Sequence, residues 1–250
     1  MQGSVYSRLT GWRQEGRCAF ALLLDPDRLP EAQVPATVDL ALEAGVDLFL
    51  VGSSLLLGDS FSRFVQQVKA RAGQCPVVLF PGNEYQVSAH ADALLFLSLL
   101  SGRNPDFLIG KQVLAAPLVW RSGLETISCA YLLIESGRLT SAQYASHTLP
   151  IPRDKPEIAL AHALAARFLG FQSIYLEAGS GARHPVPEAT IQTVAQAVAL
   201  PLFVGGGIRT PEQAAEKAQA GASVIVVGNY FENEDHRSRL RAFAQAIHQE

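Results

Sequence analysis

Three glycine-rich segments in the last third of the chain have the composition of an anion-binding site. They are YLEAGSG at residues 175–181, VGGGIRTPEQA at residues 204–214 and VVGN at residues 226–229, and each begins with the end of an apolar run. Glycines allow backbone N–H groups to approach an anion closely, and a helix that starts within the second segment adds a favourable dipole. Tight turns alone would also use such glycines, but three similar endings in succession favour a phosphate site.

An aspartate and two serines follow the first two apolar runs. Asp25 lies in LLLDPDR, and Ser53 and Ser54 lie in VGSS. If both runs are strands of one parallel sheet, these side chains meet at its carboxyl edge, where Asp25 is a candidate general base, Mg²⁺ ligand or partner of the local backbone. One carboxylate and one hydroxyl suit Mg²⁺, which completes its shell with water and phosphate oxygens. We expect Asp27 to cap the following helix.

Tyr175 and Glu177 are two residues apart, so on a strand both side chains point to the same side. A carboxylate inside a barrel needs a partner or a function, because burying a charge is costly. One interpretation is an internal hydrogen bond that joins neighbouring strands. The other is a base or hydroxyl-binding group beside the phosphate site.

Eight short apolar runs are expected to position these residues. Continuous apolar runs that end at Gly, Asp, Ser or Asn are typical of parallel strands buried on both faces. The runs cover residues 19–24, 47–51, 77–80, 93–97, 129–134, 173–176, 202–204 and 223–227. Segments with helical periodicity separate most of them, at residues 31–44, 60–72, 104–123, 156–168, 187–197 and 211–220. The alternation predicts a single α/β domain over residues 1–250, folded as a parallel (β/α)₈ TIM barrel.

Two connections depart from this regular alternation. About a dozen residues, GNEYQVSAHADA, separate the third and fourth runs, which is near the minimum for a crossover that contains a helix. We expect a loop or a single turn there, so the third helix is short or missing and one flank of the barrel is uncovered. Residues 135–155 are long, polar and contain prolines, which indicates either a lid or binding loop at the site or a plain connection.

The composition disfavours several other classes of protein. Hydrophobic residues make up 48% of the 250 residues and charged residues 17%, which predicts a folded chain with a large core. The net charge is -3 and the 20 Lys and Arg residues form no dense run, so we expect no nucleic-acid partner. Cys18, Cys75 and Cys129 fit neither a disulfide framework nor a CxxC metal site, and predict reduced thiols in the cytoplasm.

Neither of the two longest apolar stretches predicts a targeting or membrane segment. The run CAFALLL follows three arginines, as in a signal peptide, but it meets Asp25 without a small-residue cleavage site and is interpreted as a buried strand. Residues 93–100 are far shorter than the roughly 20 residues that cross a bilayer. No lysine falls at a predicted strand end, which disfavours a Schiff-base aldolase, and the histidines form no HExxH zinc motif.

Taken in order, the motifs resemble those of the geranylgeranylglyceryl phosphate synthase family, which includes the PcrB-type heptaprenylglyceryl phosphate synthases of bacteria. The resemblance runs through LLLDPD, VGSS, SGRNPDFLIG, YLEAGSG, GGGIR and VVGN and spans nearly the whole chain. SGRNP and YLEAGSG resemble the subgroup whose members mostly use a C20 prenyl donor. Members of this family resemble one another in being TIM barrels with a modified third helix. They also resemble one another in forming dimers or higher assemblies, so the resemblance implies a homo-oligomer here.

The resemblance implies a Mg²⁺-dependent prenyltransferase of ether-lipid synthesis. Its substrates would be geranylgeranyl diphosphate and the 3-hydroxyl of sn-glycerol 1-phosphate, with Asp25 and Ser54 holding Mg²⁺ and with Glu177 and Tyr175 as catalytic residues. The implied ligands of glycerol phosphate lie in the glycine-rich segments: Tyr175, Leu176, Glu177, Ala178, Gly179, Ser180, Gly181, Gly206, Gly207, Gly228 and Asn229. The chain departs from the family pattern at Leu23, where some members have a lysine, and at Ser53, which replaces a glycine.

Two other functions fit the same phosphate loops. A sugar-phosphate isomerase or cyclase would need a second acid or base opposite Asp25, and Glu135 is the candidate. A phosphate-binding module without catalytic activity would need the glycines alone. No residue pattern fixes the length of the prenyl donor or the number of subunits.

Overall fold

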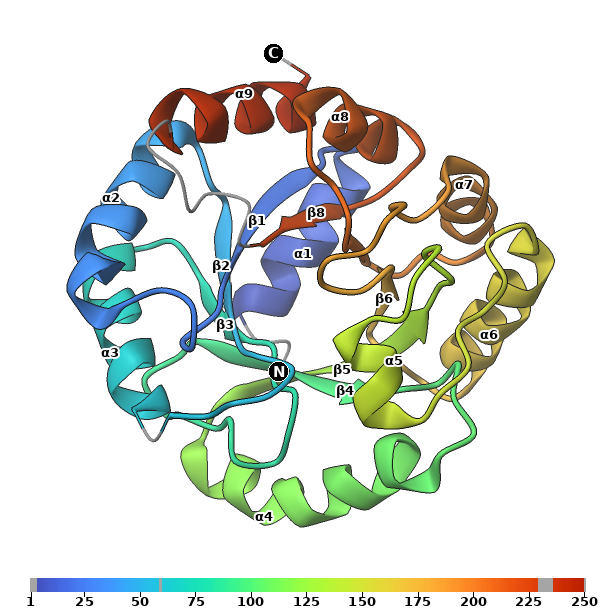
Figure 1. Ribbon diagram of the computed structural model, residues 1–250, viewed down its shortest axis with the longest axis horizontal. Helices are drawn as coiled ribbons and strands as arrows, with labels where there is room; N and C mark the ends of the chain where they lie inside the picture. The colour runs from blue at the N-terminus through green and yellow to red at the C-terminus, as the bar shows by residue number, and fades with distance from the viewer. Residues whose placement is uncertain (1–3, 59, 229–235, 250) are drawn as a thin grey trace.

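Eight parallel strands close into a barrel, as the sequence predicts (Figure 1). The computed structural model describes residues 4–58, 60–228 and 236–249. Each strand pairs with the next in the chain, and β8 pairs with β1. The strands are β1 (Ala19–Leu24), β2 (Leu48–Val51), β3 (Val77–Leu79), β4 (Ala93–Ser98), β5 (Glu125–Leu133), β6 (Ser173–Glu177), β7 (Leu202–Gly205) and β8 (Val224–Val227).

Helices form an outer ring around the strands (Figure 1). Those that cover the barrel are α2 (Val34–Ala44), α3 (Phe61–Ala72), α4 (Lys111–Ser122), α6 (Pro156–Phe168), α7 (Glu188–Ala197), α8 (Pro211–Gln219) and α9 (His236–His248). Two short turns, the 3-10 turn η1 (Glu31–Gln33) and the π-helical turn η2 (Asp106–Gly110), precede α2 and α4. The predicted helix over residues 104–123 is therefore divided into two parts.

The third crossover contains no helix, which confirms the prediction from its length. Residues 80–92 form turns and bends between β3 and β4. Pro81 and Gly82 open this segment, and both residues disfavour the interior of a helix. The next helix along the chain, α4, follows β4 instead.

Side chains alternate between the barrel interior and the layer under the helices. Leu48 and Leu50 of β2 point into the interior, whereas Phe49 and Val51 face the helices, and all four are fully buried. Complete burial of such side chains contributes about 1.5–3 kcal/mol each. The two apolar layers fix the strand register and thus determine which side chains reach the carboxyl end of the barrel.

Several elements were not predicted from hydrophobic patterns. The helix α1 (Ser4–Gln14) closes the N-terminal end of the barrel with only Val5 and Leu9 buried, and the Glu125 carboxylate accepts hydrogen bonds from the backbone amides of Val5 (2.9 Å) and Tyr6 (2.7 Å). The strand β5 begins four residues earlier than expected, because most of the first residues that pair with β4 are polar and form no apolar run.

In the part of the chain that the structure describes, no helix is both long and apolar enough to span a bilayer.

Candidate active site

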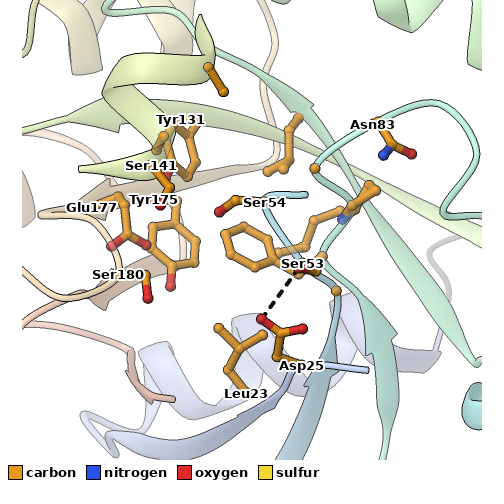
Figure 2. Close-up of a pocket in the computed structure, with 18 of the residues that line it drawn as sticks. Leu23, Asp25, Ser53, Ser54, Asn83, Tyr131, Ser141, Tyr175, Glu177 and Ser180 are labelled. Atoms are coloured by element: carbon orange, nitrogen blue, oxygen red, sulfur yellow. Dashed lines mark hydrogen bonds between the residues drawn. The ribbon is translucent and has the colours of Figure 1, made fainter. Parts of the chain in front are cut away.

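A cavity of about 590 Å³ lies at the carboxyl ends of the barrel strands. Figure 2 shows Glu177 and Ser180 on one side of this cavity and Asp25 and Ser53 on the other. Glu177 is the last residue of β6 and Ser180 follows this strand, while Asp25 follows β1 and Ser53 follows β2. The cavity therefore joins the two groups of residues that the sequence singled out separately.

Glycine backbone forms the wall of the cavity beside β6 and β7. Gly206 and Gly207 have positive φ angles of 83° and 73°, a conformation that other residues rarely adopt. A Cβ atom on Gly206 would lie 2.3 Å from Oε1 of Glu177 and 2.6 Å from the amide nitrogen of Gly179. The chain after β7 is thus pressed against the chain after β6, and a side chain at this point would collide with it.

The structure brings most of the predicted substrate residues to the cavity. The lining residues among them are Tyr175, Glu177, Ser180, Gly181, Gly206, Gly207 and Gly228. The side chains of Leu176 and Ala178 instead lie in the apolar layer under the helices. Gly179 holds the turn after β6 at a φ of 98°, and Asn229 lies outside the described residues.

Glu177 is a buried carboxylate whose environment favours the protonated form. Its side chain is only 6% exposed, and Oε1 accepts a hydrogen bond from the Gly179 amide at 2.6 Å. Desolvation by burial raises the pKa of Glu177 to about 7, although the Gly179 amide and the Tyr175 hydroxyl both oppose the shift by bonding to the carboxylate. A group with this pKa can accept and release a proton near neutral pH.

Aromatic rings form the floor of the cavity around Tyr175. The Tyr175 ring stacks on Phe80 at a centroid distance of 4.9 Å and contacts Tyr131 at 5.6 Å, while Phe203 stacks on its other side at 5.8 Å. Desolvation, followed by the nearby Glu177 charge, raises the pKa of Tyr175 well above its usual value, so its hydroxyl stays protonated and can donate to Glu177. The aromatic floor thereby fixes the orientation of that donor.

Asp25 and the serines form the opposite wall. Oδ2 of Asp25 accepts a hydrogen bond from Oγ of Ser53 at 3.3 Å, and Oδ1 accepts from the Asp27 amide at 3.0 Å. Burial raises the pKa of Asp25, and the Arg28 guanidinium at 3.7 Å only partly opposes this. Ser54 also lines the cavity. An added cation beside Asp25 would offset the cost of burying its charge.

Asp27 does not cap the following helix, contrary to expectation. Its carboxylate accepts hydrogen bonds from the amides of Leu57 (2.9 Å) and Gly58 (3.2 Å), which belong to the segment after β2. The helix α2 starts from Gln33, whose side chain makes no capping bond. Asp27 therefore holds the segment that follows Ser53 and Ser54, a long-range contact that local sequence patterns do not reveal.

Asp25 and Ser54 fit a Mg²⁺ site only if water and substrate oxygens supply the remaining ligands. Among the described residues, no group of three His, Cys, Asp or Glu side chains could hold a metal ion. Asp25 and Ser54 offer hard oxygen ligands, which suit Mg²⁺, and this ion commonly binds proteins through one or two carboxylates together with water and substrate phosphates. The half-buried carboxylate of Asp25 would give the site one negative charge for the ion.

An apolar groove extends the cavity between β4 and α4, beside the crossover that lacks a helix. Leu94 and Phe96 face outward from β4, and Ala115 and Val119 face them from α4. An ion pair between Lys111 and Glu84 (3.0 Å) lies at the same part of the cavity. The uncovered flank that the sequence predicts is thus lined by side chains that suit a hydrocarbon chain.

The segment at residues 135–155 forms part of the cavity wall through the short helix α5 (Ser141–Ser146). Ser141, Ala142 and Ala145 line the cavity, and the Thr140 side chain caps the helix by accepting from the Gln143 amide. Glu135 bonds to the amide of Gly137 within its own turn and is not among the lining residues. The segment thus contributes to the wall of the cavity, whereas Glu135, its acidic candidate for catalysis, does not reach the cavity.

The chain matches a family of known proteins over nearly its whole length. The family model described as the PcrB family matches residues 8–247. This chain belongs to the PcrB family. Relatives named geranylgeranylglyceryl phosphate synthase from Chitinophaga pinensis and Korarchaeum cryptofilum are each 44% identical to it, over 99% and 94% of this chain and 97% and 96% of their own.

The crystal structure of another protein named geranylgeranylglyceryl phosphate synthase has a fold very similar to that of this chain. It is (S)-3-O-geranylgeranylglyceryl phosphate synthase from Thermoplasma acidophilum in complex with substrate sn-glycerol-1-phosphate, with a TM-score of 0.89, 33% sequence identity and complete coverage of both chains. A thiamine phosphate pyrophosphorylase from Pyrococcus furiosus has a TM-score of 0.61 at 14% identity, which shows the barrel fold alone. Membership of the PcrB family therefore agrees with the motifs and with the missing third helix.

Sequence reasoning missed several residues of the site in this family member. Tyr131 follows the interior positions Ile127 and Cys129 at period two, so a stricter count along β5 would have placed it inside the barrel. Phe80 ends the third apolar run, at residues 77–80, and the sequence alone predicts no role for it. Gln86 lies in the polar third crossover, and no local signal distinguishes it from its neighbours.

Proposed function

We propose that this chain is a geranylgeranylglyceryl phosphate synthase, which transfers a geranylgeranyl group from geranylgeranyl diphosphate to the 3-hydroxyl of sn-glycerol 1-phosphate. The observation that carries the proposal is the single cavity that combines a glycine cradle, a buried carboxylate and an apolar groove. A small phosphate ester, a reacting hydroxyl and a long hydrocarbon chain need these three features. The names of the relatives and the ligand of the Thermoplasma acidophilum structure support the same substrates.

The acceptor would bind beside β6, β7 and β8. Backbone amides around Ser180, Gly181, Gly206 and Gly207 are available to its phosphate, and α8 starts four residues after Gly207 and directs its positive end toward the cavity side of the barrel. Glu177 would then accept a hydrogen bond from the 3-hydroxyl and take its proton as the new ether bond forms. The pKa of about 7 leaves a large fraction of Glu177 ionised at neutral pH for this purpose.

The diphosphate of the donor would bind beside β1 and β2. Asp25 and Ser54 would hold Mg²⁺, and the bound ion would take up part of the negative charge that develops on the leaving diphosphate. Ser53 keeps the Asp25 carboxylate oriented through its hydroxyl. The Tyr175, Tyr131 and Phe80 rings exclude water from the space between the two substrates.

The prenyl chain would follow the apolar groove between β4 and α4. The groove begins at the cavity and is bordered by Leu94, Phe96, Ala115 and Val119. A hydrocarbon chain gains about 0.8 kcal/mol for each buried CH₂ group, so a groove of this kind would contribute strongly to donor affinity. Its depth would also limit the length of chain that fits.

The alternative functions are less well supported. A sugar-phosphate isomerase or cyclase needs a second acid or base that faces Asp25, and Glu135 does not line the cavity. A phosphate-binding module without activity would not need a carboxylate that is buried at the site at the cost of a raised pKa. Prenyl transfer accounts for both features together with the groove.

We also propose that the chain acts as a homo-oligomer in the cytoplasm. Val113, Leu114 and Trp120 of α4 are 63%, 65% and 83% exposed, and such a row of apolar side chains favours a contact between subunits. The thiols of Cys18, Cys75 and Cys129 are all free, which suits a reducing compartment.

The activity can be tested with labelled geranylgeranyl diphosphate, sn-glycerol 1-phosphate and Mg²⁺. The product is treated with phosphatase, extracted and identified by mass as geranylgeranylglycerol, which distinguishes it from the geranylgeraniol formed by simple hydrolysis of the donor. The enantiomer sn-glycerol 3-phosphate serves as the matched acceptor control. We expect product with the first acceptor and at least tenfold less with the second, and the absence of any ether product would refute the proposal.

A further inference from the structure

Gln86 is a fully buried glutamine in the third crossover, the segment without a helix. Its Oε1 atom accepts hydrogen bonds from the amides of Ser53 (3.0 Å) and Gly82 (3.3 Å). Its Nε2 atom donates to the carbonyl oxygen of Ser53 at 2.8 Å. One side-chain amide therefore holds both backbone polar groups of Ser53.

The segments after β2 and β3 touch at this point through their backbones. A Cβ atom on Gly52 would lie 1.8 Å from the carbonyl oxygen of Phe80, and a Cβ atom on Gly82 would lie 2.2 Å from the carbonyl oxygen of Ser53. Side chains at these two glycines are thus excluded, and the hydrogen bonds of Gln86 join the two segments. The peptide groups on both sides of Ser53 are fixed by a residue more than thirty positions away in the chain.

We propose that Gln86 is a positioning residue for the diphosphate half of the site, where it holds Ser53 and Ser54 in the orientation that binds the donor. This inference rests on the proposed function. Oγ of Ser53 bonds to Asp25, and Ser54 is the next residue along the chain, so a rotation of the Ser53 peptide groups moves both hydroxyls relative to the Asp25 carboxylate. Gln86 is not among the residues that line the cavity, so it acts through the serines.

The chemistry of the side chain explains why an amide is needed. A glutamate at this position could still accept from the Ser53 and Gly82 amides, but it could not donate to the Ser53 carbonyl and would bring a negative charge beside Asp25. A leucine of similar size would leave three backbone groups without their partner. Each buried group left unpaired costs about 1–3 kcal/mol, which the segment can reduce by shifting away from its native position.

A second glutamine provides a matched control at the opposite end of the barrel. Oε1 of Gln172 accepts a hydrogen bond from the Ser128 amide at 3.0 Å and so joins β5 to the segment before β6. Gln172 lies at the N-terminal ends of the strands, away from the cavity. It fixes a neighbouring backbone as Gln86 does, but no site residue depends on it.

The test compares Gln86→Leu, Gln86→Glu and Gln172→Leu in the full chain. Steady-state kinetics give KM for geranylgeranyl diphosphate, and calorimetry gives Kd for sn-glycerol 1-phosphate in the absence of donor. For Gln86→Leu we expect KM for the donor to rise at least tenfold and Kd for the acceptor to change less than twofold. Gln172→Leu should also lower the thermal midpoint, by less because Gln172 is only partly buried and makes fewer backbone hydrogen bonds, while it leaves both constants within twofold of the parent.

Other results would overturn the inference. Equal weakening of donor and acceptor binding in Gln86→Leu would indicate a general structural role, and an unchanged donor KM would exclude positioning. If Gln86→Leu does not fold, Gln86→Glu keeps two of the three hydrogen bonds and is subject to the same two criteria. Failure of the parent chain to form any ether product would instead refute the proposed function, so the two failures can be told apart.

Discussion

The two halves of the cavity are built from different materials. Beside β6 and β7 the wall is glycine backbone, and a Cβ atom on Gly206 would collide with Glu177. Beside β1 and β2 the wall includes the side chains of Asp25 and Ser53, which share a hydrogen bond, and Gln86 supports Ser53 from behind the wall. The half beside β6 and β7, the backbone half, is sensitive to added atoms. The half beside β1 and β2, the side-chain half, is also closely packed, at Gly52 and Gly82, and in addition depends on side-chain donors and acceptors.

The largest expected effect concerns the side-chain half. Asp25→Asn removes the negative charge proposed to hold Mg²⁺ while it keeps the size of the side chain, so the rate of transfer should fall about 10³-fold or more. The acceptor affinity, measured by calorimetry with sn-glycerol 1-phosphate, should hardly change. Asp39→Asn is the matched control, because this carboxylate on α2 pairs with Arg71, does not line the cavity and should keep most of the activity. Full activity of Asp25→Asn would reject a metal role for Asp25.

The next effect concerns the carboxylate of the backbone half. Glu177→Gln keeps an acceptor for the Gly179 amide but cannot take a proton, so kcat should fall about 10²–10⁴-fold. Glu135→Gln is the control, since Glu135 does not line the cavity and should leave kcat unchanged. A large loss in the Glu135 variant would favour the isomerase or cyclase alternative.

The same substitution should alter the dependence of stability on pH. Burial raises the pKa of Glu177 to about 7 from an ordinary value of 4.5, so between these pH values the native state retains a proton that the unfolded chain has released. The contribution of Glu177 to the free energy of unfolding therefore falls as pH rises through this window, by about 3 kcal/mol in total. Urea unfolding without ligands should show Glu177→Gln to be more stable than the parent at pH 8, with the difference much reduced at pH 4.5. An equal difference at both pH values would contradict the buried charge as its cause.

The contrast between the halves also explains what the sequence could predict. The barrel depends on local patterns, such as the apolar runs of β1 and β6, and this prediction is confirmed. The structure places the glycines at 206 and 207 at the cavity, and their role in binding phosphate stays a prediction. The predicted roles of Asp25, Ser54 and Glu177 in binding and catalysis stay predictions. Gln86 and Asp27 act across 30 residues or more, and the helix α1 is held by Glu125 from the far side of the barrel. These contacts form only in the folded barrel, so local sequence patterns do not predict them.

A smaller effect is expected when a side chain is added to the glycine wall beside β6 and β7. Gly206→Ala places a methyl group against Glu177 at a φ of 83°, so Kd for sn-glycerol 1-phosphate should rise about 10–100-fold, equivalent to about 1.4–2.8 kcal/mol. Gly170 has nearly the same φ, 81°, but nothing lies within 4 Å of an added Cβ, so Gly170→Ala measures the backbone strain alone. That control should lower the thermal midpoint without affecting acceptor binding. Similar acceptor affinities in the two variants would show that close packing at Gly206 is not needed.

The smallest expected effect concerns the groove that belongs to neither half. Ala115 lines the groove on α4, so a phenylalanine there would occupy space that the distal part of the prenyl chain needs. Ala115→Phe should shift the ratio of kcat/KM between C20 and C15 diphosphates about tenfold toward the shorter donor, because a few methylene groups at about 0.8 kcal/mol each lose their burial. The next residue, Ala116, is exposed on the same helix, and Ala116→Phe should leave the ratio unchanged. The roles proposed for Asp25 and Glu177 concern the diphosphate and the hydroxyl, which both donors share. An unaltered ratio in Ala115→Phe would therefore place the prenyl chain outside this groove without affecting the assignment of the two halves.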